Sequence, residues 1–390
     1  MTITVEELYS EILLNFTELI LGKCSICGEK SVTISDSLGV CLKCIMDKPE
    51  LALEVTKDVH TKSRAVFGLP SKPPKDVGGL LCRVCPNNCV IGVGNCGFCG
   101  LVQNVDERLV RFGGSADKGI LEWYYDDLPT NCVSWWFCPA CTGKGYPKYA
   151  YKPKTECGYA NLAVFYGACS YDCLYCQNWH YRNLTVNHKP VMSAEDLASK
   201  VNPHVSCICY FGGDPSPQMP HSLEVTRIAL EKAKAEKRIL RICWETNGYM
   251  NPKLAEKAAE YALESGGNMK FDLKAWSEEL NIALCGVSNK PTFRNFKMIG
   301  EKFYKQRKEL PVLCASTLLV PGYIDAEEVR NIAGFISEID PNMPYTLLAF
   351  HPCYVLNDLP ATSKKQALEC LKAAKQHAKN TRIGNIHLIS

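Results

Sequence analysis

Residues 167–182, GACSYDCLYCQNWHYR, decide how the second half of this chain is interpreted. They place Cys169, Cys173 and Cys176 in a Cys-x3-Cys-x2-Cys pattern directly after a predicted strand at 161–165. Thiolates at such spacing are typical ligands of an iron–sulfur cluster, which normally takes four protein ligands. No fourth cysteine or histidine follows in register, so the motif predicts a cluster with one iron open to another ligand. A structural zinc site and an ordinary ferredoxin-type cluster are the alternatives.

Beyond residue 160, strand-like and helix-like segments alternate. Capping residues predict helix starts at Ser193, Asn251 and Asp325. Repeated strand–helix units favour an α/β fold with a parallel sheet, here a partial parallel (β/α)6 TIM-like barrel over residues 161–390. In such a barrel the chemistry lies at the carboxyl ends of the strands. The predicted strands are 161–165, 206–211, 239–243, 268–273, 312–319, 345–349 and 385–389.

The three-cysteine motif resembles the signature of the radical S-adenosylmethionine (SAM) superfamily, with Tyr175 in its aromatic position. This resemblance implies a [4Fe–4S] cluster held by Cys169, Cys173 and Cys176, with SAM on the fourth iron. It further implies that one electron from the reduced cluster cleaves the sulfonium of SAM. The resulting 5′-deoxyadenosyl radical would then abstract hydrogen from a substrate.

Segments at the ends of later strands extend the resemblance. FGGDP at 211–215 is similar to the Gly-Gly-Glu-Pro motif of the family, with Asp for Glu. The segments WETNG, KFDLK, TLLVPG and FHP then follow in the order found in glycyl-radical-enzyme activating enzymes, such as pyruvate formate-lyase activase. The resemblance implies cofactor-binding roles for Tyr175, Gly212, Gly213, Asp214, Glu245 and Asn247. It implies catalytic roles for Asp272, Lys274 and His351.

Thirteen of the 23 cysteines lie between residues 24 and 157. Two CxxC pairs at 23–47 predict a tetrahedral zinc-ribbon-like site, or a single iron in rubredoxin style, held by Cys24, Cys27, Cys41 and Cys44. A module this short needs such a crosslink to fold, and docking to a macromolecule is a second interpretation.

Nine further cysteines fall in the segment 80–160, which is long and poorly periodic. They suffice for two auxiliary [4Fe–4S] clusters with one thiol left over, or for one cluster and bystanders. Such clusters would relay electrons, anchor substrate or stabilise the segment as structural crosslinks. The candidate ligands are Cys82, Cys85, Cys89, Cys96, Cys99, Cys132, Cys138, Cys141 and Cys157.

The remaining divisions are an N-terminal helix at 1–22 and a helical, then Pro-rich, linker at 48–79. Glutamates among the first 20 residues argue against a signal peptide, and no stretch of 18 apolar residues predicts a membrane span. Paired thiols without a secretion signal indicate metal ligands in a reducing cytoplasm. The net charge of +3 over 390 residues indicates no particular partner.

Together these features predict an oxygen-sensitive radical SAM enzyme of the activase-like branch, with a flavodoxin- or ferredoxin-type electron donor. Its substrate, a protein or a small molecule, is not encoded in any motif. The alternative is a multi-cluster electron-transfer or nucleic-acid-binding (RNA-modifying) protein. Residues 142–154 interleave four lysines with three tyrosines, which suits single-stranded nucleic acid or a solvated loop.

Overall fold

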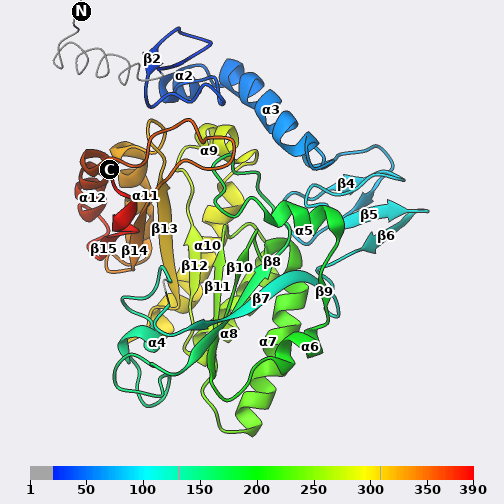
Figure 1. Cartoon of the computed structure of the whole chain (residues 1–390), viewed down its shortest axis with the longest axis vertical. Coiled ribbons are helices and arrows are strands. Elements are labelled where there is room, and N and C mark those ends of the chain that lie inside the picture. Colours follow the sequence, from blue (N-terminus) through cyan, green and yellow to red (C-terminus); the bar gives the residue numbers. More distant parts are fainter. Residues whose placement is uncertain (1–20, 131, 308) are drawn as a thin grey trace, which may run out of the picture.

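The computed structural model describes residues 21–390 except 131 and 308 (Figure 1). The helix predicted at 1–22 lies outside the described residues, apart from its last two positions. No helix in the described part is long and apolar enough to span a membrane.

A nine-stranded sheet in the order β15-β14-β13-β12-β11-β10-β8-β7-β9 forms the centre of the fold (Figure 1). Seven of its described strands are mutually parallel, as predicted. The strands are β7 (Gly119–Asp127), β8 (Ala160–Tyr166), β9 (Val191–Met192), β10 (Val205–Gly212), β11 (Arg241–Thr246), β12 (Met269–Asp272), β13 (Leu313–Leu319), β14 (Tyr345–Ala349) and β15 (Thr381–Gly384).

Two predictions about this sheet need correction. The sheet is mixed, because β7 pairs antiparallel with both β8 and β9. A loop without a long crossover helix joins β7 to β8, and such a connection favours antiparallel pairing. The last strand is not 385–389: residues Thr381–Gly384 pair with β14, and Ile386–Leu388 form the 3-10 turn η3.

Helices connect the parallel strands, and their predicted caps are confirmed. Ser193, Asn251 and Asp325 each accept hydrogen bonds from backbone N–H groups of the following first turn. The helices of this half are α5 (Tyr181–Asn187), α6 (Ala194–Ser199), α7 (Met219–Ala235), α8 (Pro252–Ser265), α9 (Glu278–Cys285), α10 (Lys290–Phe303), α11 (Ala326–Ile339) and α12 (Lys364–Lys375), with 3-10 turns η1 (Ser216–Gln218) and η2 (Tyr304–Gln306).

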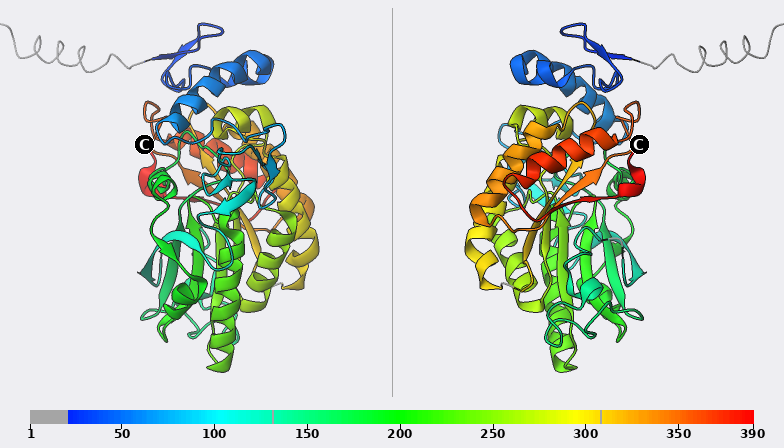
Figure 2. Two further views of the ribbon diagram at one scale, coloured as in Figure 1. Left: turned by 90° about the vertical axis from the view of Figure 1, so that its right-hand side faces the viewer. Right: turned by 90° about the vertical axis from the view of Figure 1, so that its left-hand side faces the viewer.

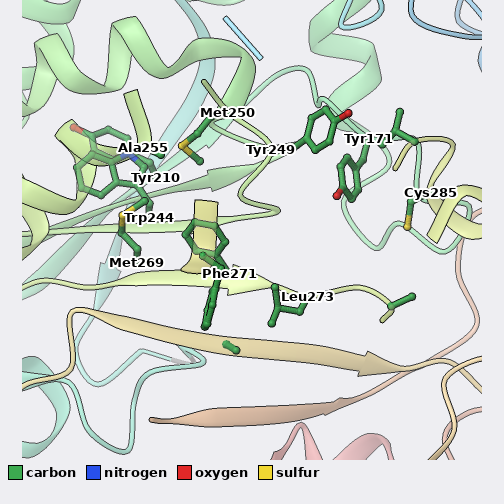
Figure 3. Close-up of a cluster of buried hydrophobic side chains, with 14 of the residues drawn as sticks. Tyr171, Tyr210, Trp244, Tyr249, Met250, Ala255, Met269, Phe271, Leu273 and Cys285 are labelled. Atoms are coloured by element: carbon green, nitrogen blue, oxygen red, sulfur yellow. The ribbon is translucent and has the colours of Figure 1, made fainter. Parts of the chain in front are cut away.

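One face of the sheet is apolar and packs on the helices. Tyr210, Trp244 and Met269 are register neighbours on three adjacent strands, and all three are fully buried (Figure 3). The Tyr210 hydroxyl hydrogen-bonds Thr226, and the Trp244 indole donates to Ser222, both on α7. Burial of each large side chain contributes roughly 1.5–3 kcal/mol, so this row holds α7 firmly against the sheet.

The small N-terminal module lies at the carboxyl end of the sheet (Figures 1 and 2). It consists of β1 (Gly22–Lys23), β2 (Lys30–Ser31) and α2 (Leu42–Asp47). The Tyr323 hydroxyl donates to the Val40 carbonyl at 2.9 Å, and Ser35 donates to Asp358 at 2.8 Å. A Cβ on Gly322 would stand 2.0 Å from the Thr33 carbonyl oxygen. The glycine of the LVPG segment is therefore required by the close approach of this module.

Helix α3 (Pro49–Ala65), predicted as part of a linker, packs against α9 instead. After it come two hairpins and a short helix: β3 (Leu80–Leu81) with β4 (Val90–Ile91), β5 (Val102–Val105) with β6 (Arg108–Arg111), and α4 (Pro139–Thr142). Asn87 Nδ2 donates to the Ser170 carbonyl at 2.9 Å, which ties the first hairpin to the three-cysteine loop.

A buried ion pair fixes the chain between β7 and β8 to the sheet. Arg241 donates two hydrogen bonds to the Glu156 carboxylate, at 2.9 and 2.6 Å, and a third to the Tyr149 carbonyl at 2.8 Å. Two tyrosines of the Lys/Tyr-rich stretch at 142–154 contribute to this anchoring. The ring of Tyr151 stacks on that of Tyr159 with the ring centroids 4.5 Å apart, and Tyr149 supplies the carbonyl to which Arg241 donates. The ion pair and these contacts hold residues 132–159 against the sheet.

We expect Glu156→Ala to lower the free energy of unfolding by about 3–5 kcal/mol, because Arg241 would remain buried without its counter-charge. Urea unfolding followed by circular dichroism measures this loss. The matched control is Glu224→Ala, which removes an ion pair with Arg227 on the surface of α7 and should cost below about 1 kcal/mol. Equal losses in the two variants would contradict the prediction.

Candidate functional site

The three-cysteine loop lies at the carboxyl end of β8 and is held by backbone hydrogen bonds. The Asp172 and Leu174 N–H groups donate to the carbonyls of Cys285 and Leu284 at the end of α9, at 2.9 and 3.0 Å. The Leu174 carbonyl accepts from the N–H groups of Val355 and Leu356. The loop is thus fixed between α9 and the segment after β14.

A buried carboxylate within the loop joins three other segments. Asp172 accepts a hydrogen bond from Arg182 of α5 at 2.7 Å and contacts His60 of α3 at 2.9 Å. Arg64 of α3 lies 3.5 Å from the same carboxylate. Burial alone would raise the pKa of Asp172, but His60 and the two arginines outweigh burial and hold that pKa well below its usual range. The loop therefore carries a permanent negative charge that anchors α3 and α5.

Gly212, the last residue of β10, and Gly213 after it must both be glycine, because a larger residue would clash with the chain at the end of β8. A Cβ on Gly212 would lie 2.5 Å from the Tyr166 nitrogen, and one on Gly213 would lie 2.3 Å from the Ala168 carbonyl oxygen. Gly212 also has φ of +112°, which disfavours any other residue. Their backbone thus lies directly against the end of β8 and the start of the cysteine loop.

The hydrogen bonds to the Asp214 carboxylate all come from groups of the protein itself. Its buried carboxylate accepts hydrogen bonds from the backbone N–H groups of Ser216 and Asn247, at 2.7 and 2.6 Å, and from the Thr246 hydroxyl at 3.0 Å. Burial raises its pKa, and these hydrogen bonds oppose the rise. Asn247 in turn reaches Cys169, with Nδ2 3.5 Å from Sγ. In this structure Asp214 thus positions Asn247 beside the first thiol.

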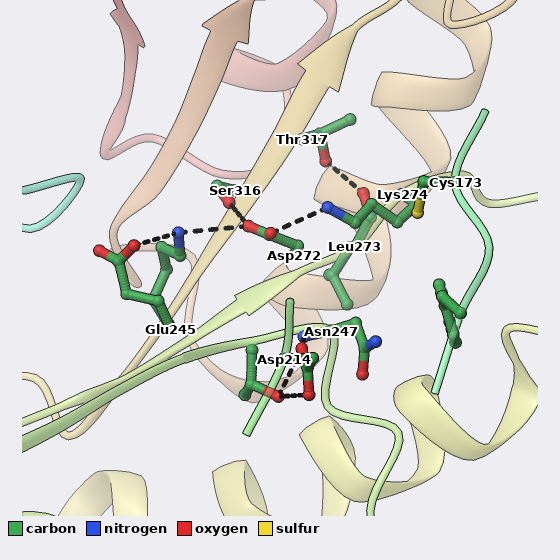
Figure 4. A network of polar contacts seen from close by, with 12 residues as sticks. Cys173, Asp214, Glu245, Asn247, Asp272, Leu273, Lys274, Ser316 and Thr317 are labelled. Atoms are coloured by element: carbon green, nitrogen blue, oxygen red, sulfur yellow. Dashed lines mark hydrogen bonds and ion pairs between the residues drawn. The ribbon is translucent and has the colours of Figure 1, made fainter. Parts of the chain in front are cut away.

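A row of alternating charges crosses β11 and β12 (Figure 4). Lys270 Nζ lies 3.0 Å from Glu245 and 3.4 Å from Asp272, and Lys274 Nζ lies 2.9 Å from Asp272. Burial opposes ionisation of Asp272, but the two lysines outweigh it and lower its pKa. For Lys274, likewise, Asp272 outweighs burial and raises the pKa. Asp272 and the two lysines are therefore ionised at neutral pH.

These elements surround a cavity of about 260 Å³ at the carboxyl end of the strands. Cys169, Cys173 and Cys176 line it, and no other cysteine and no histidine of the described residues does so. This donor set fits a cluster with one open corner. The lining also includes Tyr175, Gly212, Gly213, Asp214, Glu245, Asn247, Lys270, Asp272 and Lys274.

His351, the third predicted catalytic residue, does not line this cavity. Its Nδ1 lies 3.1 Å from the Pro352 carbonyl oxygen beyond β14. Lys270 lines the cavity but was not predicted. The period-2 alternation of β12, which places Lys270 on the same side as Asp272, is the signal that could have identified it.

Cys285, at the end of α9, was also missed. Its Sγ lies 3.5 Å from the Sγ of Cys173 and 3.5 Å from the Tyr175 hydroxyl. In a four-iron cluster each thiolate binds a different iron, so ligating sulfurs stand roughly 6 Å apart. Cys285 is too close to Cys173 to be a second ligand of one cluster, and it fits the role of a thiol that hydrogen-bonds a ligand. No local signal connects it to a loop more than a hundred residues away.

The four N-terminal cysteines form a compact group outside this cavity. Their ligand atoms all lie within 4.8 Å of one another, and the Sγ atoms of Cys27 and Cys41 are 3.8 Å apart. Metal–sulfur bonds of about 2.3 Å in a tetrahedron separate sulfurs by about 3.8 Å. Burial raises the pKa of Cys24, but hydrogen bonds within the group outweigh it and lower that pKa to about 6. This geometry fits a single tetrahedral ion.

Seven of the other nine upstream cysteines line one of two further cavities, and three of the seven, Cys132, Cys138 and Cys141, lie at the cavity between the sheet and the chain that joins β7 to β8. The other four line a small cavity beside Pro217, where Arg111 also donates to the Cys82 sulfur at 3.2 Å. Cys96 and Cys157 line neither this cavity nor the others described here. The four at the small cavity are Cys82, Cys85, Cys89 and Cys99.

Comparison with known proteins agrees with this geometry. Residues 163–336 match the model of the Radical SAM superfamily. The chain contains a radical SAM domain. The predicted relationship is thereby confirmed, and such a domain implies a [4Fe–4S] cluster and SAM as cofactors.

The radical SAM chain has curated relatives at low identity. An uncharacterized protein of Methanocaldococcus jannaschii is 26% identical over 325 residues, covering 80% of this chain and 83% of that protein. A second protein of that organism, provisionally named a glycyl-radical enzyme activating enzyme, is 27% identical over 187 residues, covering 47% of this chain and 64% of its own length. These similarities, with the domain, indicate an enzyme of unspecified class.

Among solved structures, a domain of pyruvate-formate lyase-activating enzyme from Bacteroides vulgatus is similar at 17% identity. The match covers 45% of this chain and 98% of that domain, with a TM-score of 0.35. A TM-score this low carries no argument about function.

We expect the double variant Cys24→Ser/Cys44→Ser to lose one metal ion per chain, because two of the four ligands of a tetrahedral site are gone. Elemental analysis of the purified protein measures zinc and iron together and identifies the ion. Cys370→Ser, which alters a buried cysteine of α12, is the control and should leave the metal content unchanged. An unaltered metal content in the double variant would show that the compact group binds no ion.

Proposed function

We propose that this chain is a radical SAM enzyme that reductively cleaves SAM and abstracts hydrogen from a substrate. The observation that supports this most is the cavity lined by three thiols from one loop and bounded by Gly212, Gly213 and Asn247. When bound, the cluster would supply one electron to the sulfonium and generate a 5′-deoxyadenosyl radical. The residues of the chain would hold both cofactors and set their charge.

Cys169, Cys173 and Cys176 are the proposed cluster ligands. The hydrogen bond with Cys285 and burial raise the pKa of Cys173, and burial raises the pKa of Cys176; the ammonium group of Lys274 opposes both rises. A buried ammonium group beside the loop favours the thiolate form that binds iron. The Asp172 network holds the loop rigid, since α3, α5 and α9 all contact it.

The polar wall of the cavity is the proposed SAM site. The ammonium and carboxylate groups of SAM need partners of both charges, and the row Glu245–Lys270–Asp272–Lys274 presents both along one wall. Asn247 lies between this wall and Cys169. Tyr175 lines the cavity on the side of the three-cysteine loop, and its hydroxyl contacts the Cys285 thiol.

The activase-like relatives support a glycine backbone of a partner protein as the substrate, with a small metabolite as the other candidate. A flavodoxin- or ferredoxin-type protein is the proposed electron donor. We further propose that Cys82, Cys85, Cys89 and Cys99 hold an auxiliary metal centre, because all four line one cavity. The N-terminal four cysteines are proposed to hold a structural zinc.

Replacing Cys173 by Ala should abolish 5′-deoxyadenosine formation, because the catalytic cluster loses a ligand. The assay uses protein reconstituted with iron and sulfide under nitrogen, reduced with dithionite and supplied with SAM, and chromatography quantifies the product. Cys285→Ala is the matched control: it should keep the cluster iron and still form 5′-deoxyadenosine. Wild-type protein that contains the cluster yet forms no 5′-deoxyadenosine would refute the enzyme proposal and favour an electron-transfer protein.

We expect Lys274→Met to lower the rate of 5′-deoxyadenosine formation by about tenfold or more, which corresponds to about 1.4 kcal/mol of lost stabilisation. The substitution removes a buried positive charge beside the proposed cofactor site. His351→Ala should stay within about twofold of the wild type, because His351 does not line the cavity. A larger loss of 5′-deoxyadenosine formation for His351→Ala than for Lys274→Met would show that His351, and not Lys274, acts at the cofactor site.

A further inference from the structure

A second cavity, of about 140 Å³, lies between the sheet and the chain that joins β7 to β8. Its volume is about ten times the roughly 10–15 Å³ that one water molecule needs. Six cysteines line it, together with Asp126, Asn161, Arg241 and Glu245. The cysteines are Cys132, Cys138, Cys141, Cys207, Cys209 and Cys243.

Three of these thiols come from the inner face of the sheet. Side chains two residues apart on a strand point to the same side, so Cys207 and Cys209 of β10 face one way. Cys243 of β11 is the register partner of Cys209 and lies beside it on that face. Inward positions of parallel barrels are usually filled by branched aliphatic residues, and this barrel presents a patch of sulfur instead.

The other three thiols come from the covering chain and are held in place. Cys138 directly precedes α4 and Cys141 lies within it, so this short helix carries both thiols. The Cys132 sulfur lies 3.5 Å from Glu245. The buried Glu156–Arg241 pair anchors this chain to the same strand that carries Cys243. The thiols therefore face one another across the cavity from two rigid elements.

The spacing of the thiols distinguishes a cluster from a single ion. Within the described residues, the N-terminal group is the only set of three or more candidate ligands whose ligand atoms all lie within 4.8 Å of one another. The six thiols of the second cavity do not meet that spacing, and neither do Cys169, Cys173 and Cys176. Both sets are therefore too widely spaced to hold one tetrahedral ion, whereas the thiolates of a four-iron cluster each bind a different iron and need not be so close.

We propose that the second cavity binds a [4Fe–4S] cluster through Cys132, Cys138 and Cys141 of the covering chain and Cys243 of β11. Among the strand thiols, Cys243 lies two residues before Glu245 on β11 and so on the same face, and the Glu245 carboxylate is 3.5 Å from the Cys132 sulfur. Cys207 and Cys209 line the wall beside it. Cys157, which is exposed and outside the cavity, is not a ligand.

Glu245 connects this site to the catalytic one. It lines both cavities, contacts Cys132 on one side and pairs with Lys270 on the other. The proposed cluster would thus lie behind the charged wall of the SAM cavity, inside the barrel. This assignment rests on the thiol geometry alone and does not depend on SAM cleavage.

The test uses the full chain with Cys169, Cys173 and Cys176 replaced by Ala, so that the catalytic cluster is absent. After anaerobic reconstitution, the further double substitution Cys138→Ala/Cys141→Ala should remove about four irons and four sulfides per chain. The reduced parent should show an EPR signal that does not respond to SAM. The double substitution should remove the part of that signal that belongs to this cluster and leave any signal from a centre at Cys82, Cys85, Cys89 and Cys99. Circular dichroism and retention of the N-terminal metal ion establish that the variant is folded.

Two control substitutions in the same parent are Cys157→Ala and Cys370→Ala, which should leave iron, sulfide and EPR signal unchanged. If Cys138→Ala/Cys141→Ala does not fold, Cys243→Ser tests the same site and should lower the iron content or change the EPR signal. Unchanged iron, sulfide and EPR signal in folded variants would overturn the proposal and leave a thiol-lined pocket. Loss of one metal ion without sulfide would overturn it in favour of a single-ion site.

Discussion

The buried carboxylate of Asp172 is the interaction on which the architecture of the proposed catalytic site depends. It lies within the three-cysteine loop and is neutralised by groups from α3 and α5. Breaking a buried ion pair by removing one partner is far more costly than breaking a surface pair. The loop therefore cannot move independently of α3, and through α3 the cysteine-rich N-terminal region is coupled to the sheet.

The two faces of the sheet carry different kinds of side chain. One face carries the apolar row of Tyr210, Trp244 and Met269 and holds the helices. The other face carries thiols toward the amino ends of its strands and charged groups at their carboxyl ends. Glu245 lies at the boundary between these two polar regions and contacts both. The apolar face thus packs on the helices, and the thiols and charged groups are gathered on the opposite face.

The parallel strands and the helix caps were predictable because each depends on local spacing. The direction of β7 was not, since it depends on a long connection with little periodicity of its own. The roles of glycines were only partly predictable. Gly212 and Gly213 lie beside the cavity as expected, but their crowding is with β8 and the loop, and Gly322 is required by the N-terminal module. Local sequence shows that a glycine is present and does not show which atom approaches it.

The sequence by itself determined the three-cysteine loop, the order of the strand-end motifs and the pairing of the four N-terminal thiols, because in each case the ligands are neighbours along the chain. Only the tertiary structure decided which distant cysteines meet. Cys285 reaches Cys173 from α9, and Cys243 faces Cys138 from β11, across separations of more than a hundred residues. Such contacts follow from strand register and from the anchoring of Glu156 on Arg241, and neither of these leaves a periodic trace in the sequence.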